Sequence, residues 1–205
     1  MTNQGKFPTR SIQQFLPVNV DTFIEKIKVA LFDGRMTDLQ IESVKAIMNQ
    51  CLIQSVLDIR CVAYIFASAY YDSYNPRTHP NERLVPTNEI GSSPTLRGLA
   101  YYPYYGRSFS QLRYKHHYRS ESLRHDLDIL YDPDLMLDIN VSANTHVYAL
   151  NNGLHWGRKL GDFIYGNFAD YTKCRRTCSN RNGRWEVAER AFKFEYCLRK
   201  SVIAI

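Results

Sequence analysis

Two stretches near the beginning of the chain carry apolar residues at the spacing of one helix face. The first runs from Val20 to Leu31, and the second follows a break at Gly34. Recurrence at intervals of three and four residues predicts amphipathic α-helices. Thr37 and Gln40 have the spacing of a capping box, which predicts that the second helix begins directly after Thr37. The apolar positions are Phe23, Ile24, Ile27 and Leu31 in the first stretch, and Ile41, Val44, Met48 and Cys51 in the second.

A third stretch is apolar on nearly all sides. It runs from Cys61 to Tyr70, and Asp58 precedes it as a candidate N-cap. A helix without a polar face is normally buried, so we expect this one to pass through the core. The stretch ends in a single carboxylate, and we therefore expect Asp72 at the C-terminal end of a buried helix.

The pattern changes between residues 73 and 100, where prolines and glycines exclude long regular elements. We expect a long loop there, and long loops in compact domains are usually functional or disordered. Further along, the pattern predicts a short helix that stops near Gly153 and a last helix from Arg184 to Lys200. The chain is therefore predicted to be mainly α-helical, with one large polar and aromatic loop region after the core helix.

Length and charge limit the remaining choices. A chain of 205 residues favours one domain, which we place at 21–205 after an N-terminal extension at 1–20. The net charge of +6 favours encounter with a polyanion such as an acidic glycan, a bacterial envelope or nucleic acid. No stretch approaches the roughly 20 apolar residues that cross a bilayer, and the first residues lack the apolar segment of a signal peptide. We therefore expect cytoplasmic synthesis without a membrane span.

The five cysteines favour reduced, structural thiols. Their number is odd, and their spacing fits neither a disulfide framework nor a zinc ribbon. Cys174 and Cys178 could share one helix face, but no nearby His or Cys pair completes a tetrahedral site. Adjacent residues such as His116 and His117 rarely bind one ion together. We therefore predict neither a metal site nor a cofactor.

Several segments occur in the same order as in the family 19 chitinases and the related phage endolysins, enzymes of the lysozyme-like superfamily. They read FDGRMTDLQIESVKAI, VAYIFASAYYDS, PTNEIG, YYPYYGRSFSQL, DPDLMLDI and LHWGRKLGDFI. The chain resembles this family over residues 24–195, and most specifically from Tyr104 to Leu112. The resemblance implies a mainly α-helical, lysozyme-like domain in which two lobes enclose a glycan cleft.

The resemblance also implies two catalytic carboxylates. Family members hydrolyse β-1,4 bonds between N-acetylated hexosamines with inversion, which needs an acid and a base about 6.5 to 9.5 Å apart. Asp72, in AYYDS, stands at the position of the acid, and Glu89, in PTNE, at the position of the base. Glu82 is the alternative for the second carboxylate.

Other residues of the matching segments are candidates for substrate contact. They are Tyr105, Arg107, Gln111, Arg113, His117 and Arg175, with Arg176 as the alternative to Arg175 beside the carboxylates. An amide both donates and accepts hydrogen bonds, which suits Gln111 to a sugar. Tyrosines in such a turn have packing between two lobes as their alternative role.

Departures from the family pattern weaken the expectation of catalysis. Asp72 is one methylene shorter than the glutamate of the family, and a displacement of about 1 Å can reduce a rate on the order of a hundredfold. Arg113 replaces a Ser or Thr that helps hold the attacking water, and a guanidinium accepts no hydrogen bond. A nearby cation also favours an ionised acid. His117 replaces an Asn that contacts the substrate in the family.

Two hypotheses follow. In the first, the protein binds a peptidoglycan or chitin polymer, or has a place in a larger assembly such as a virion, with catalysis weakened or lost. In the second, it is an active inverting glycosidase in which Asp72 is the acid, Glu89 the base and Arg175 holds the pair. The segment RYKHHYR interleaves basic and aromatic residues, but its place in the matching region favours a cleft wall over nucleic-acid binding. A function at the envelope or in a virion would require release from the cytoplasm.

Overall fold

The chain folds into a mainly α-helical structure, as predicted. The computed structural model describes residues 18–74, 83–90, 93–154, 156–178 and 182–203. The helices are α1 (Val20–Leu31), α2 (Asp38–Ile53), α3 (Ile59–Asp72), α4 (Ser93–Arg97), α5 (Lys115–His125), α6 (Ile139–Asn152), α7 (Tyr171–Cys174) and α8 (Arg184–Arg199). Three 3-10 turns are η1 (Pro133–Leu137), η2 (Leu160–Asp162) and η3 (Arg175–Thr177), and a hairpin pairs β1 (Ile164–Tyr165) with β2 (Phe168–Ala169) in antiparallel register.

Helices α2 and α3 begin where their capping residues predict. Thr37 Oγ accepts a hydrogen bond from the backbone N–H of Gln40, and the Gln40 side chain accepts one from the backbone N–H of Thr37, at 3.2 and 2.9 Å. The Asp58 carboxylate accepts from the backbone N–H of Arg60 at 2.9 Å. These bonds satisfy amides that a helix start leaves without intrahelical partners, and so they define where α2 and α3 begin.

Helix α3 forms the centre of the larger hydrophobic core. Every residue from Cys61 to Tyr70 is buried, and α3 packs most extensively against α8. The rings of Phe66 and Phe194 stack with centroids 5.6 Å apart. The burial of this all-apolar helix places its last residue, Asp72, at the edge of the core.

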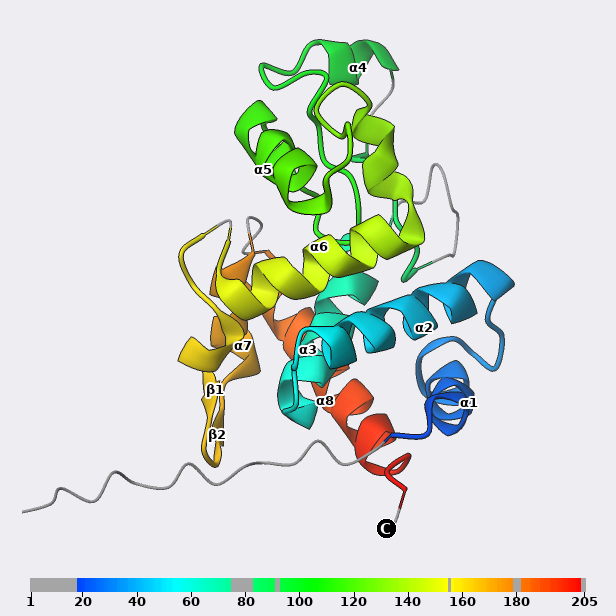
Figure 1. Cartoon of the computed structure of the whole chain (residues 1–205). Coiled ribbons are helices and arrows are strands. Elements are labelled where there is room, and N and C mark those ends of the chain that lie inside the picture. Colours follow the sequence, from blue (N-terminus) through cyan, green and yellow to red (C-terminus); the bar gives the residue numbers. More distant parts are fainter. Residues whose placement is uncertain (1–17, 75–82, 91–92, 155, 179–181, 204–205) are drawn as a thin grey trace, which may run out of the picture.

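The structure has two lobes on either side of α6. Figure 1 shows α4, α5 and η1 on one side, and α1, α2, α3, α7, α8 and the hairpin on the other. Each lobe has its own hydrophobic cluster, and the smaller one is formed by Leu112, Tyr118, Ile129 and Met136. The predicted pair of lobes is therefore present.

Two elements differ from the sequence-based expectation. Helix α6 is 14 residues long, not short, although it ends as predicted before Gly153, whose φ is +71°. Helix α5 was not predicted, because it lacks an apolar stripe: its buried residues are Tyr118 and the charged Glu121. A hydrophobic pattern cannot reveal a helix that is held by aromatic and ionic contacts.

The described part of the chain begins beside its end. Val18 forms a bridge with Val202, and the backbone N–H of Asn19 donates to the carbonyl of Ser201 at 2.8 Å. Residues 1–17 lie outside the described residues, so the boundary at residue 20 stays a prediction. Among the described helices, none is long and apolar enough to cross a membrane.

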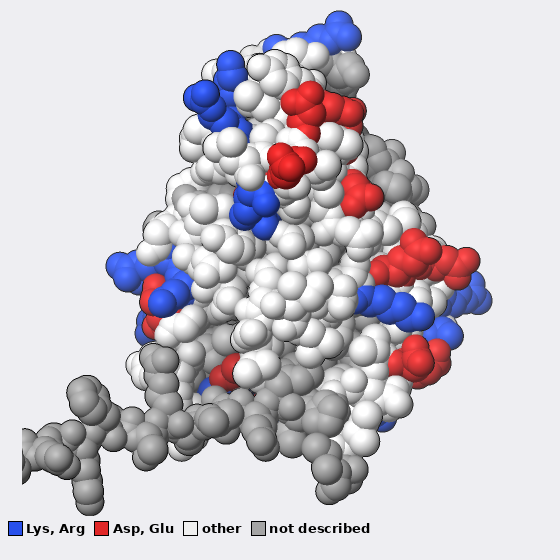
Figure 2. Space-filling view, viewed as in Figure 1, with Lys and Arg blue, Asp and Glu red and all other residues white. Residues whose placement is uncertain are grey.

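Charged side chains are mixed on the viewed surface. Figure 2 shows small groups of Lys and Arg that alternate with groups of Asp and Glu around a wide uncharged area. On this face the basic side chains therefore do not form one continuous stripe.

Candidate functional site

Two adjoining cavities lie where α3 ends and the segment 83–90 passes the segment 110–113. We call the first the carboxylate cavity: it measures about 380 Å³ and is lined by Tyr71, Asp72, Tyr74, Arg83, Asn88, Glu89, Ile90, Ser110, Gln111 and Arg113. The second, the side cavity, measures about 130 Å³ and is lined by Ser68, Asp72, Ser110, Gln111, Leu112, Arg113, Tyr114, His117, His146, Ala149, Leu150, Trp156, Thr177 and Cys178. The two cavities share Asp72, Ser110, Gln111 and Arg113, which therefore form their junction.

Asp72 is held in a buried ion pair with Arg175. The two terminal nitrogens of Arg175 donate to the two carboxylate oxygens at 2.5 and 2.6 Å, and Ser68 Oγ adds a third hydrogen bond at 3.2 Å. The side chains of Arg175 and Asp72 are 2% and 9% exposed. Burial alone would lower the pKa of Arg175, but the carboxylate of Asp72 outweighs it and raises that pKa. Arg175, and not the exposed Arg176, is thus the arginine beside this carboxylate.

Glu89 lines the same cavity and also has an arginine partner. Arg113 Nη2 donates to Oε1 at 2.6 Å, the Tyr101 hydroxyl donates to the same oxygen at 3.1 Å, and the backbone N–H of Gly106 donates to Oε2 at 2.9 Å. Burial and the charge of Glu89 both raise the pKa of Tyr101. The alternative carboxylate, Glu82, lies outside the described residues.

The side chain of Gln111 connects the segment that contains Glu89 to the segment around Ser108. Its side-chain N–H groups donate to the carbonyls of Thr87 and Ser108 at 2.9 and 3.2 Å. Its carbonyl oxygen lies so near Gly106 that a Cβ there would be only 2.8 Å from it. Gly106 is therefore required by close approach, and the amide donors of Gln111 are already used within the protein.

Tyr105 and Arg107 are placed in the packing of the smaller lobe. Arg107 is 3% exposed, donates to Asp134 and to the carbonyl of Pro103, and stacks on the Tyr105 ring at 3.7 Å. Neither Tyr105 nor Arg107 lines the carboxylate cavity or the side cavity. Tyr105 thus packs inside the smaller lobe, and not between the two lobes as the alternative role for the tyrosines had it.

His117 lines the side cavity and is oriented by its own helix. A carbonyl oxygen only accepts, so the Nδ1 of His117 donates to the carbonyl of Arg113, 2.7 Å away. Burial lowers the pKa of His117. Among the described residues, no group of three His, Cys, Asp or Glu side chains is arranged to hold a metal ion. Cys174 is buried and its pKa is raised by that burial, while the thiol of Cys178 lines the side cavity.

Sequence reasoning missed Ser110 at the junction and His146 in the wall of the side cavity. His146 lies on α6 and is 1% exposed, and its Nδ1 is 2.9 Å from the Ser110 hydroxyl. The one signal was a histidine on an otherwise apolar helix face between Ala143 and Leu150, which indicates burial but not a partner. Only the packing of α6 against the segment 108–113 brings the two side chains together.

Comparison with known proteins finds little. No protein-family model matches the chain, and no curated protein matches it. Among solved structures, the chain is similar to one described as the crystal structure of a chitinase C mutant, with 15% sequence identity and a TM-score of 0.49. The similarity covers 94% of this chain and 97% of that one.

Proposed function

We propose that this protein is a chitinase-like, lysozyme-fold protein that binds an N-acetylhexosamine polymer, peptidoglycan or chitin, along the two adjoining cavities, and that its catalysis is weakened or lost. The ordered motifs from Tyr104 to Leu112 and around Asp72 support the class of ligand. The single observation that carries the loss of catalysis is the buried, two-point ion pair between Asp72 and Arg175.

A general acid must carry a proton before it can give one to the leaving oxygen. Both oxygens of Asp72 accept hydrogen bonds from Arg175, and Oδ2 accepts a further one from Ser68. A proton on either oxygen would replace one of these charge-assisted bonds, which are among the stronger hydrogen bonds in proteins. Both oxygens of Asp72 are thus occupied by donors within the protein, and a leaving oxygen would have to compete with them.

Glu89 has a related disadvantage as a base. Arg113, Tyr101 and the N–H of Gly106 already donate to its two oxygens. A water that approaches Glu89 must compete with these donors, and the Arg113 guanidinium cannot accept a hydrogen bond that would orient the water. Each carboxylate is thus occupied by an arginine from another segment of the chain.

One observation favours the alternative, an active inverting glycosidase. Asp72 and Glu89 come from different segments, yet they line the same cavity. An inverting hydrolase needs two carboxyl groups that face one substrate from opposite sides. Their shared cavity supports this alternative, while the ion pairs oppose the chemistry.

Purified cell walls and chitin, each incubated with the native chain, test the proposal. We expect the chain to sediment with one of the two polymers and to release no reducing ends above background. Asp72→Ala and Glu89→Ala should leave that background unchanged, as should Asp128→Ala at an exposed position. Release of reducing ends that Asp72→Ala and Glu89→Ala abolish, while Asp128→Ala does not, would establish the active alternative. Absence of binding to both polymers would refute a glycan-binding role.

A further inference from the structure

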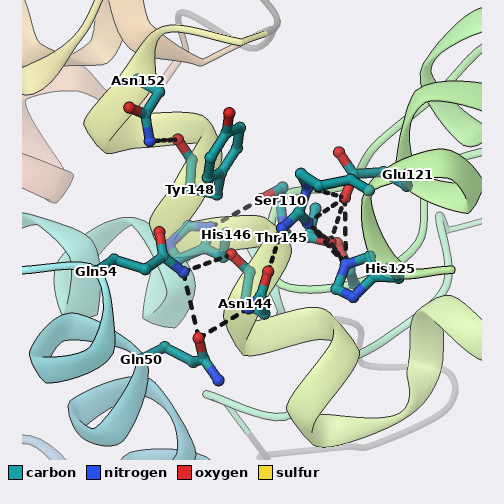
Figure 3. A network of polar contacts seen from close by, with 12 residues as sticks. Gln50, Gln54, Ser110, Glu121, His125, Asn144, Thr145, His146, Tyr148 and Asn152 are labelled. Carbon is teal, nitrogen blue, oxygen red and sulfur yellow. Dashed lines mark hydrogen bonds and ion pairs between the residues drawn. The ribbon is translucent and has the colours of Figure 1, made fainter.

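The hydroxyl group of Ser110 lies at the junction of the two cavities, and its hydrogen points away from both of them. Ser110 Oγ lies 2.9 Å from His146 Nδ1, and His146 Nε2 lies 3.0 Å from the carbonyl oxygen of Ile65 in α3. Figure 3 shows His146 on α6 with its contact to Ser110. The three groups form a chain of hydrogen bonds that runs from the buried core helix to the cavity wall.

The donor and acceptor of both hydrogen bonds follow from the last group, the backbone carbonyl of Ile65. A backbone carbonyl can only accept, so Nε2 of His146 carries a hydrogen and donates it to Ile65. In a neutral imidazole the other nitrogen is then an acceptor, so the Ser110 hydroxyl must donate to Nδ1. The oxygen of Ser110 is left as an acceptor for any group in the cavity.

Burial keeps His146 in this neutral form. It lowers the pKa of His146 to about 4, although the hydrogen bond to Ile65 acts in the opposite direction. Asp72 and Arg175 face the imidazole with opposite charges, and their direct pairing leaves no net charge beside it. At neutral pH the hydroxyl of Ser110 is therefore constantly held toward His146.

The groups around Ser110 match the chemical groups of an acetamido substituent. Leu112, Ala149 and Leu150 supply apolar surface in the side cavity, and Trp156 adds a ring that is 44% exposed. Arg113 lies at the same junction and brings guanidinium N–H donors. An acetamido group has a methyl for the apolar wall, a carbonyl for a donor and an N–H for an acceptor.

We propose that Ser110 accepts the amide N–H of a sugar's acetamido group, whose methyl enters the side cavity, and that His146 is the positioning residue that turns the Ser110 hydroxyl to allow it. This assignment rests on the proposed glycan-binding function and adds the basis for selecting N-acetylated sugars. Replacing acetamido by hydroxyl would leave the apolar wall and the acceptor without their partners.

Calorimetric titration of the full chain with the β-1,4-linked tetramer of N-acetylglucosamine and with cellotetraose provides the test. Cellotetraose carries a hydroxyl where the first ligand carries an acetamido group. The native chain should bind the N-acetylated tetramer at least tenfold more tightly. Ser110→Ala should weaken that binding about fivefold to tenfold, the effect of one hydrogen bond, and leave cellotetraose binding unchanged. Ser120→Ala, at an exposed position on α5, should change neither.

Variants of His146 and a nitrogen-15 spectrum test the role of His146 separately. His146→Phe should weaken binding of the N-acetylated tetramer as much as Ser110→Ala, with no further loss in the double variant, because it frees the Ser110 hydroxyl to rotate and so affects the same hydrogen bond. His146→Gln, whose side chain can donate and accept at once, should retain selectivity. Since His146 is buried, a substitution there can unfold the protein, so the nitrogen-15 spectrum of the native protein provides an independent test: Nε2 should carry the hydrogen and Nδ1 should not.

The outcomes separate this assignment from the function on which it rests. If the native chain binds neither the tetramer nor the polymers, the proposed function and the assignment are both wrong. If the native chain binds the tetramer and Ser110→Ala binds it equally well, only the assignment is wrong. An Nδ1-protonated His146 would also overturn the assignment alone. Loss of hydrolysis with unchanged binding in Ser110→Ala would instead assign the Ser110 oxygen to a water and overturn both.

Discussion

Asp72 and Arg175 form a buried ion pair that joins segments distant in the chain. Arg175 is almost fully buried and also donates from Nε to the carbonyl of Asn182 at 3.0 Å, so it joins the end of α3 to the chain before α8. Breaking a buried pair by removing one partner costs more than the pair contributes, because a charge remains buried without compensation.

At the residue scale we predict that Arg175→Gln lowers the free energy of unfolding by about 3 to 5 kcal/mol. Adding Asp72→Asn should recover part of this loss, since no uncompensated carboxylate remains. Urea unfolding followed by circular dichroism measures both. The neighbouring Arg176 is exposed, so Arg176→Gln should change stability by less than about 0.5 kcal/mol. Equal losses in the two single variants would contradict a structural role for the ion pair.

At the scale of elements, the beginning of α8 approaches the end of α3 at a glycine. Gly183 is the N-cap of α8 with φ of +68°, and a Cβ there would lie only 2.1 Å from the Tyr71 ring. The Arg175 guanidinium lies over the same ring, 5.1 Å from the ring centroid. The contact between the two helices thus also determines the position of the ring beside Asp72.

Gly183→Ala tests this contact, and Gly157→Ala is its matched control. Gly157 has a similar φ of +63°, but among the described residues no atom lies within 4 Å of a Cβ added there. Gly157→Ala should cost about 1 to 2 kcal/mol of unfolding free energy from backbone strain alone. Gly183→Ala should cost about 1 to 3 kcal/mol more, from overpacking against Tyr71. Equal costs in urea unfolding would show that the ring moves aside freely.

At the scale of the whole molecule, buried polar groups join the two lobes. Glu121 on α5 is fully buried and accepts hydrogen bonds from Thr145 on α6, at 2.7 Å, and from Arg124. Figure 3 shows this group with Asn144, Gln50 and Gln54, which continue the contacts to α2. Burial alone would raise the pKa of Glu121, but its hydrogen bonds, that of His125 largest, lower it to about 2.

Because His146 and Glu121 are buried, we predict that the free energy of unfolding falls in two steps as pH decreases. The pKa of His146 is lower in the folded protein, about 4, than its ordinary 6.5, so its contribution is present above pH 6.5 and is lost as pH falls toward 4. A difference of this size corresponds to about 3 kcal/mol. Glu121 follows between its ordinary pKa of 4.5 and about 2.

Urea unfolding at a series of pH values from 7 to 2 measures both steps. His146→Gln should remove most of the step between pH 6.5 and 4, and His117 contributes a smaller part with the same sign because burial lowers its pKa as well. Ser120→Ala, at an exposed position on α5, should leave the profile unchanged. A native profile that is flat from pH 7 to 4 would contradict the buried, neutral state of His146.

The sequence pattern was sufficient to predict those features of the structure that depend on residues close together in the chain. The capping box of Thr37 and Gln40 and the N-cap at Asp58 satisfy amides within a few residues, and apolar spacing identified the faces of α1 and α2. Helix α5 was not predicted because its burial depends on Tyr118 and Glu121, whose partners are distant in sequence. The position of Asp72 at the end of the core helix was confirmed, while its catalytic role stays a prediction.

The sequence by itself determined the mainly helical architecture, the apolar core helix and the carboxylate at its end, because these depend on periodicity and on short-range hydrogen bonds. Only the tertiary structure decided which partners the site residues have: Arg175 for Asp72, Arg113 for Glu89, and His146 for Ser110. The physical reason is that a charge or hydroxyl behaves according to the groups within a few ångströms of it, and here those groups are brought together by packing between segments that are distant in the chain.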